Sequence, residues 1–183
     1  MGLIKLVSHN MINRGLQLVV GLNVDTIPFS LEGDCVAGGI YYCESHDIGH
    51  WLGLGYYYMC TVVVPDDART VKFKHKYRSD KIVLSDMCHI SDHSMWCDQE
   101  LCKLAVQQYG YALQYVKVQT EELCKLAVQQ DGNALQFVKV QTEELCKLAV
   151  QKNSYAIQYV KVQTEELCKL AVQKNGIALQ YIN

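Results

Sequence analysis

The chain has 183 residues, half of them apolar, with 17 Lys and Arg residues against 19 Asp and Glu residues. This composition predicts a globular protein of one or two domains and excludes a disordered chain. Residues 1–97 carry 8 basic and 10 acidic side chains, and residues 98–183 carry 9 of each. Neither half has the basic excess that binding to a nucleic-acid backbone needs, so we expect no nucleic-acid partner.

The start of the chain shows no targeting pattern. Residues 1–6 lack the apolar run and cleavage site of a secretory signal, and Leu6 stands where myristoylation needs Ser or Thr. No apolar stretch is as long as a membrane-spanning helix requires, so we expect no membrane partner. The nine cysteines are an odd number, which favours reduced thiols in an intracellular protein over a disulfide framework.

Residues 1–97 predict an α+β domain with a mixed or antiparallel sheet. Ile48, Trp51 and Leu52 have helical spacing and predict a short helix over residues 44–52. All six histidines and both tryptophans fall in this half, which sets it apart from the rest of the chain. Runs typical of strands cover residues 40–42, 59–64, 71–78 and 81–84.

The connector at residues 86–97 contains a candidate metal site. Its Cys88, His89, His93 and Cys97 are ligand types that suit zinc. On a helix, the last three would share one face. Structural zinc sites usually have paired Cys-x2–4-Cys spacing, which is lacking here. The segment therefore has two interpretations, a zinc site or an ordinary polar connector.

The C-terminal half is a repeat array. The sequence Leu-Cys-Lys-Leu-Ala-Val-Gln begins at Leu101 and returns at Leu123, Leu145 and Leu167, always at the same 22-residue interval. A fixed period in this range is typical of stacked repeats. We therefore predict a short α-helical solenoid of four helix-turn-helix repeats. They cover residues 98–119, 120–141, 142–163 and 164–183.

The sequence of each copy predicts two short helices. In the second copy, Thr120 is a good N-cap, and Glu121 and Glu122 favour the positive end of the helix. Gly132 is expected to end this helix in a left-handed conformation, and a second helix follows over residues 134–140. Cys124 and its three counterparts form a column whose helix spacing of roughly 8–10 Å is too wide for disulfides. We expect them to be small buried side chains.

The copies differ mainly at the turn between their two helices. Sequence changes at this edge could alter a partner-binding surface without disturbing the packing of the repeats. The other interpretation is neutral sequence drift at exposed loops. The candidate partner-binding residues are Tyr109, Tyr111, Asp131, Asn133, Asn153, Tyr155, Asn175 and Ile177. The last copy has no polar capping repeat after it, so we expect an exposed apolar face and weak self-association through it.

Three segments carry a resemblance to a known group. Residues 21–25, 38–42 and 78–84 resemble the N-terminal domain of uncharacterised repeat proteins from giant, mimivirus-like DNA viruses, where it often precedes ankyrin repeats. The second half looks like another helical repeat of such genomes. The resemblance implies a viral protein in the host cytoplasm or the virion, with a host or viral protein as partner.

A second resemblance concerns chemistry. His9, the segment 38–42 and the segment 80–83 are similar in order to the His–Tyr–Glu arrangement of poly-ADP-ribosyltransferase-like domains. The resemblance implies that His9 holds a ribose hydroxyl of NAD, Tyr41 stacks on nicotinamide and Asp80 stabilises the developing cation. The chain departs from that pattern, because Asn10 follows His9 and the acid is Asp. Our leading hypothesis is therefore a non-enzymatic protein-binding scaffold without a cofactor. An NAD-dependent ADP-ribosyltransferase with a repeat targeting module and a zinc-stabilised binding domain are the alternatives.

Overall fold

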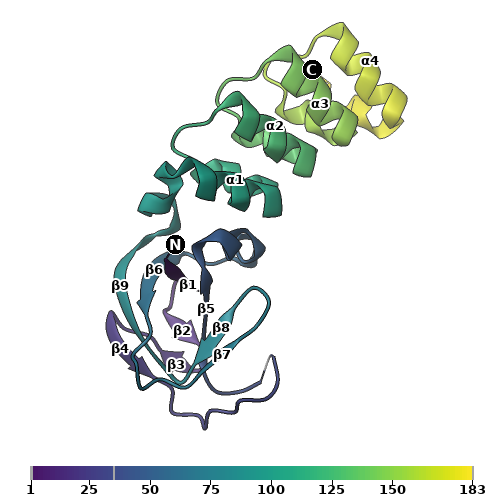
Figure 1. Ribbon diagram of the computed structural model, residues 1–183. Helices are drawn as coiled ribbons and strands as arrows, with labels where there is room; N and C mark the ends of the chain where they lie inside the picture. Colours follow the sequence, from purple (N-terminus) through teal and green to yellow (C-terminus); the bar gives the residue numbers. More distant parts are fainter. Residues whose placement is uncertain (1, 35, 183) are drawn as a thin grey trace. The chain divides into compact units, whose positions relative to one another are not determined.

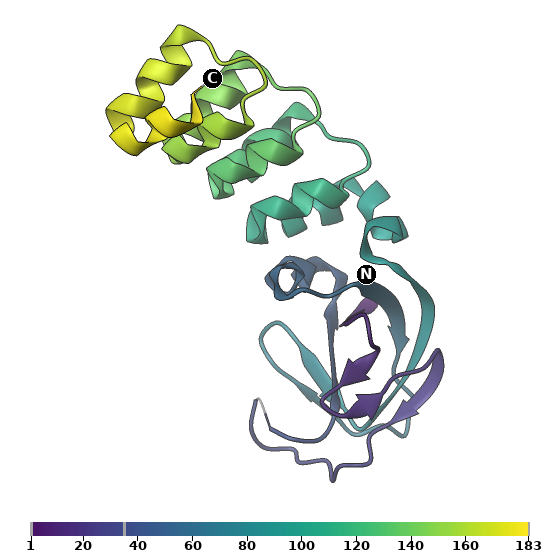
Figure 2. The ribbon, with the colours of Figure 1, turned by 180° about the vertical axis from the view of Figure 1, so that it is seen from behind.

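The computed structural model describes residues 2–34 and 36–182, and Figures 1 and 2 show it from two opposite sides. The chain divides into two compact units, Met1–Met95 and Trp96–Asn183. The first unit is built on an antiparallel sheet and the second on helical repeats, so the α+β class is confirmed. Within the described residues, no helix has the length and apolar character needed to cross a membrane.

The first unit contains a seven-stranded antiparallel sheet in the order β4-β9-β6-β1-β5-β8-β7, and β2 pairs with β3 separately. The long strand β9 is paired with β4 on one side and with β6 on the other. The strands are β1 Leu3–Val7, β2 Ile12–Asn13, β3 Leu16–Gln17, β4 Gly21–Val24, β5 Ile40–Glu44, β6 Tyr58–Val63, β7 Thr70–Lys72, β8 Tyr77–Ser79 and β9 Lys81–His89.

Alternating side chains of the central strands form the core of this unit. Ile40 and Tyr42 of β5 pack with Cys60 of β6 and with Ile82 and Leu84 of β9. All five are almost completely buried. Burial of this kind is the main favourable contribution to folding.

The predicted strand over residues 71–78 is wrong in its middle. The chain turns at residues 73–76, where the Phe73 N–H donates to the Lys76 carbonyl at 2.8 Å. β7 and β8 are therefore the two arms of an antiparallel hairpin. The alternation in the sequence continues through the turn, and a two-residue period alone does not show where a strand folds back.

The short helices of the first unit are 3-10 helices. The predicted helix over residues 44–52 forms as η1 Ser45–His50 followed by η2 Leu52–Leu54, and Gly55 ends it with φ 77°. A left-handed residue in that place favours glycine. The connector holds η3 Ile90–Asp92 and η4 Ser94–Cys97, so it is not one continuous helix.

The second unit repeats one motif, a ten-residue α-helix followed by a six-residue 3-10 helix. The predicted caps are present, and Thr120 Oγ1 accepts the Leu123 N–H at 3.2 Å. The second element of each copy is a 3-10 helix, shorter than the predicted segment 134–140. The pairs are α1 Gln99–Gln108 with η5 Gly110–Tyr115, α2 Glu121–Gln130 with η6 Gly132–Phe137, α3 Glu143–Lys152 with η7 Ser154–Tyr159, and α4 Glu165–Lys174 with η8 Gly176–Tyr181.

The role predicted for Gly132 is wrong. Asp131, in extended conformation with φ −145°, ends α2 and precedes η6, and Gly132 does not have a positive φ. The backbones approach closely here, because a Cβ atom on Gly132 would lie 2.6 Å from the Ala149 carbonyl of the next repeat; the third copy accommodates Ser154 at the equivalent position. The absence of a side chain at Gly132 therefore permits close packing between repeats and is not required by the turn.

Candidate functional site

A glutamine in each linker joins neighbouring repeats through backbone groups. Gln119 Nε2 donates to the carbonyls of Leu113 and Phe137 at 3.2 and 2.9 Å, and its Oε1 accepts the Lys139 N–H at 2.9 Å. Gln141 makes the same three bonds one repeat later. Each amide therefore fixes the end of its own 3-10 helix against the end of the next one.

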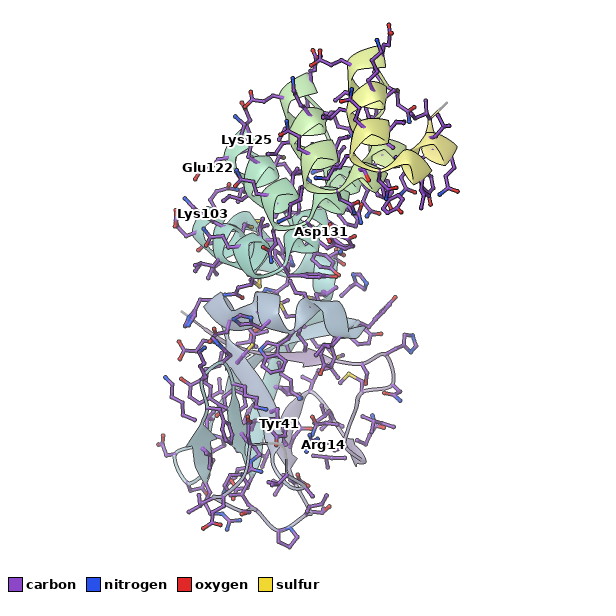
Figure 3. The ribbon with its side chains drawn as sticks, turned by 90° about the vertical axis from the view of Figure 1, so that its right-hand side faces the viewer. Arg14, Tyr41, Lys103, Glu122, Lys125 and Asp131 are labelled. Atoms are coloured by element: carbon purple, nitrogen blue, oxygen red, sulfur yellow. The ribbon has the colours of Figure 1, made fainter. Side chains whose placement is uncertain are left out.

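Ion pairs connect the α-helices in the same register. Lys103 pairs with Glu122 at 2.7 Å, and the equivalent bonds in later repeats are Lys125–Glu144 and Lys147–Glu166. Figure 3 shows Lys103, Glu122 and Lys125 along the same side of the helices. Exposed pairs like these contribute little stability each. Their regular spacing produces a solvated face of alternating charge.

The variable edge has structural contacts of its own. Asp131 Oδ1 accepts the Asn133 N–H at 2.9 Å, and Asn153 and Asn175 cap the next two 3-10 helices in the same way. Tyr109 has no such side-chain cap; its ring lies 5.5 Å from that of Tyr111. The cap position therefore prefers Asp or Asn for a local reason.

The same edge also carries bonds between repeats. Asn153 Nδ2 donates to Asn133 Oδ1 at 3.1 Å, and Asn175 Nδ2 donates to the Tyr155 hydroxyl at 3.0 Å. Ile177 ends this row and is 58% exposed. The sequence differences on this edge thus fall on residues that contact each other across repeats, and their role in partner binding stays a prediction.

A row of exposed valines was missed in the sequence. Val118, Val140 and Val162 occupy equivalent linker positions and are 64%, 78% and 76% exposed. They were overlooked because they do not vary, and variation was the signal used. Their recurrence once per copy, next to a polar Lys and Gln, was the available clue.

The last repeat leaves apolar side chains uncovered. Leu113, Leu135 and Ile157 are fully buried, whereas Leu179 in the equivalent place is 64% exposed. Each earlier 3-10 helix is covered by the α-helix of the following repeat, as α3 covers η6. No described helix covers η8 in this way, so the expected apolar face is present.

The cysteine column consists of free thiols. Cys102, Cys124 and Cys146 are buried and Cys168 is half-buried. Burial raises the pKa of Cys102 to about 11. These side chains behave as small apolar groups.

Tyr41 lines a cavity of about 320 Å³ in the first unit, together with Lys5, Arg14, Trp51 and Lys76. The Arg14 guanidinium and the Lys76 ammonium each lie 4.9 Å from the centre of the Tyr41 ring. Figure 3 shows Arg14 next to Tyr41. Among the described residues, the lining includes three cationic side chains and no Asp or Glu.

Lys5 is the unusual member of this lining, since it is only 4% exposed. Its Nζ donates to Asn13 Oδ1 at 3.0 Å and to the Tyr41 carbonyl at 2.8 Å. Burial lowers the pKa of Lys5 to about 8. A buried cation without a carboxylate partner is costly. Lys76 already pairs with Asp34 at 2.7 Å, so Lys5 and Arg14 are the cations of this lining that could meet an anionic group.

The other two residues of the NAD hypothesis lie elsewhere. The His9 ring packs 5.0 Å from that of Tyr57, and neither His9 nor Asp80 lines the Tyr41 cavity. The Asp80 carboxylate is bonded by the Arg69 backbone N–H at 2.9 Å and by its Nε at 2.8 Å. The structure therefore does not bring the three residues together in this cavity, and their catalytic role stays a prediction.

The predicted zinc ligands do not gather among the described residues. Cys88 and His89 are neighbours on β9, where successive side chains point to opposite faces. The ring nitrogen Nδ1 of His93 instead accepts the Met95 N–H at 3.2 Å, and Cys97 is exposed. The segment does not form the one helix on which His89, His93 and Cys97 would share a face, and their role as zinc ligands stays a prediction.

Three other ligand-type side chains do gather. The ligand atoms of Asp47, His50 and His75 all lie within 4.8 Å of one another. The sequence does not show this group directly, because His75 is distant from His50 in the chain. The clue was His46-x3-His50, two histidines spaced as on one short helix.

Comparison with known proteins concerns mainly the repeats. A family model described as "Domain of unknown function (DUF4116)" matches residues 98–141, 120–163 and 142–183. Each match spans two consecutive copies of the repeat predicted from the sequence. Residues 98–183 are thus similar to this family.

A protein of Acanthamoeba polyphaga mimivirus, named as an ankyrin repeat protein, is 30% identical over 82 residues. The alignment covers 40% of this chain and 27% of the mimivirus protein, so the chain spans about a quarter of that relative. This similarity supports the resemblance to giant-virus repeat proteins. It adds no support to the ADP-ribosyltransferase resemblance. No solved structure matches the chain.

Proposed function

We propose that this chain is a non-enzymatic protein-binding scaffold of a giant-virus type, acting in the infected cell, in the host cytoplasm or the virion. Its four copies form a short α-helical solenoid that presents a repeated surface to a host or viral protein. The main support is the exposed row Val118, Val140 and Val162, with one valine in each of the first three copies. Exposed apolar side chains in a regular row mark an interaction surface better than scattered ones.

The variable edge, at the other end of each α-helix, supplies a second candidate surface. Tyr109, Tyr111 and Tyr155 offer aromatic area, and Asp131 with Asn133, Asn153 and Asn175 offers polar groups. Tyrosine is enriched at protein interfaces, because its ring packs and its hydroxyl bonds. In this proposal the invariant valines supply affinity and the variable edge, with Ile177, supplies selectivity.

The test compares partners captured by the full chain and by the triple variant Val118→Asp, Val140→Asp, Val162→Asp. The proposal expects a protein that the wild type captures reproducibly from infected-cell lysate and the triple variant loses. The matched control is Gln107→Glu, Gln129→Glu, Gln151→Glu, which adds three charges at exposed helix positions. Equal capture by the wild type and both variants, all folded by circular dichroism, would contradict the proposal.

The Tyr41 cavity favours a second candidate function, the binding of an anionic nucleotide such as NAD. Lys5 and Arg14 can neutralise phosphate charge, and Tyr41 and Trp51 offer flat rings. Titration with NAD should change the fluorescence of Trp51, and Lys5→Met should abolish that change. Absence of any change with NAD, in a chain that retains its fold, would remove this candidate. Only transfer of label from NAD to protein, lost in Tyr41→Ala and Asp80→Asn, would support catalysis.

A further inference from the structure

A cluster of histidines and one aspartate connects two separate segments of the first unit. Asp47 and His50 lie on η1, where side chains three residues apart share a face of a 3-10 helix. His75 comes from the turn between β7 and β8. The hairpin turn missed in the sequence is therefore what places His75 opposite η1.

The carboxylate of Asp47 lies at the centre of the cluster. Its Oδ1 is 2.9 Å from His75 Nδ1 and 4.0 Å from His50 Nε2. Its Oδ2 is 3.4 Å from His46 Nε2. Around a tetrahedral zinc ion, neighbouring N and O ligands are about 3.4 Å apart. The observed separations lie on both sides of this value, so small rotations of side chains would bring the atoms to it.

The two imidazoles of His50 and His75 contact each other, with ring centroids 4.2 Å apart. The neutral imidazole is the form that binds metal ions.

We propose that Asp47, His50 and His75 form a three-residue binding site for a divalent transition-metal ion, with solvent completing the coordination. Nitrogen and carboxylate donors in this number suit Zn²⁺. The backbone at His75 is hydrogen-bonded to the residue that follows η1, because the Trp51 Nε1–H donates to the His75 carbonyl at 3.3 Å. A bound ion would link η1 to the β7–β8 hairpin and stabilise the folded unit.

The test uses the full chain, freed of metal and kept reduced, and titrated with Zn²⁺ and with Co²⁺. We expect one tight ion per chain, a higher Tm with Zn²⁺, and a visible Co²⁺ spectrum without near-ultraviolet thiolate bands. His50→Ala and His75→Ala should each weaken binding at least about 100-fold, more than the loss of an outer-shell partner. His9→Ala and His93→Ala are the matched controls and should bind as the wild type does.

Three outcomes would overturn the proposal. They are no binding by the wild type, thiolate bands in the Co²⁺ spectrum, and unchanged affinity in the His50→Ala, His75→Ala double variant. His50 has a side chain that is 38% exposed, so His50→Ala is expected to keep the fold. Circular dichroism of the metal-free variant checks this, and Asp47→Asn gives a second variant of nearly the same shape.

Discussion

Gln119 in the first repeat donates from Nε2 to the carbonyl of Phe137 in the second, at 2.9 Å. The same bond recurs one repeat later, from Gln141 to Tyr159. The amide completes the hydrogen bonding at the ends of two 3-10 helices together. Repeat-to-repeat cohesion therefore depends on a polar side chain as well as on buried leucines.

We predict that Gln141→Ala lowers the free energy of unfolding by about 1–3 kcal/mol, because it removes the hydrogen bonds of two half-buried carbonyls and one exposed N–H. Urea unfolding followed by circular dichroism measures this change. Gln129→Ala, at an exposed helix position, is the control and should stay within about 0.5 kcal/mol of the wild type. Similar values for the two variants would show that the amide bridges carry no net stability.

Two equivalent glycines should respond differently to the same change. Gly132→Ala should destabilise by about 1–3 kcal/mol, since the new methyl group meets a backbone carbonyl. Gly176→Ala, with nothing within 4 Å of its Cβ position, should be neutral or stabilise by about 0.4–1 kcal/mol. Thermal unfolding of both variants decides the point. Equal effects would disprove the close-packing role assigned to Gly132.

Two leucines at equivalent positions, Leu135 and Leu179, should also differ in how much their truncation lowers stability. Leu135→Ala should cost about 2–5 kcal/mol, because it opens a cavity under the next repeat. Leu179→Ala removes a largely exposed side chain and should cost less than about 0.5 kcal/mol. Chemical denaturation measures both. A large loss at Leu179 would mean that this side chain is covered in solution.

The uncovered face of η8 leads us to expect weak self-association. Sedimentation over a concentration series should show a reversible rise in average mass for the wild type. Leu179→Asp should shift the chain to a monomer at every concentration, because it places a charge on the apolar face. A wild-type chain that is monomeric throughout the series would refute this expectation.

Lys5 should make stability depend on pH. Its folded pKa is about 8 against an ordinary value of 10.5. Below pH 8 both states hold the proton and the burial cost is fully present. Between pH 8 and 10.5 the unfolded state keeps a proton that the folded state has lost, so this contribution to stability rises with pH. The full change is about 3 kcal/mol at roughly 1.4 kcal/mol per pH unit.

Lys5→Met, which removes the charge and fills the same space, measures this term. The stability advantage of the variant should be largest below pH 8 and shrink toward pH 10.5. Taking the difference between the two chains cancels the titration of cysteines and tyrosines, which both share. A difference that stays constant across this range would show that Lys5 does not titrate as described.

The repeat half was largely readable from sequence, because its period, caps and apolar faces all agree. The local sequence around Thr120 predicts an N-cap, and the structure contains this cap. Gly132 was misread, because its constraint is the Ala149 carbonyl of another repeat. A single copy of the sequence does not reveal which neighbour it will touch.

The N-terminal half was less readable, because its sites depend on long-range pairing. His75 reaches Asp47 only because the chain turns back at residues 73–76, inside a run of unbroken alternation. Lys5 likewise lies beside Tyr41 because of sheet register between distant strands. Composition predicts a sheet here, but it does not predict which side chains the sheet brings together.

Because Gln119 and Gln141 make the same bonds to equivalent groups, the linker hydrogen bonds do not depend on which copy is the neighbour. Loss or duplication of one unit by unequal recombination would keep this linker chemistry at each remaining junction. The length of the repeat array can thus change by one whole copy at a time, with the linker hydrogen bonds retained.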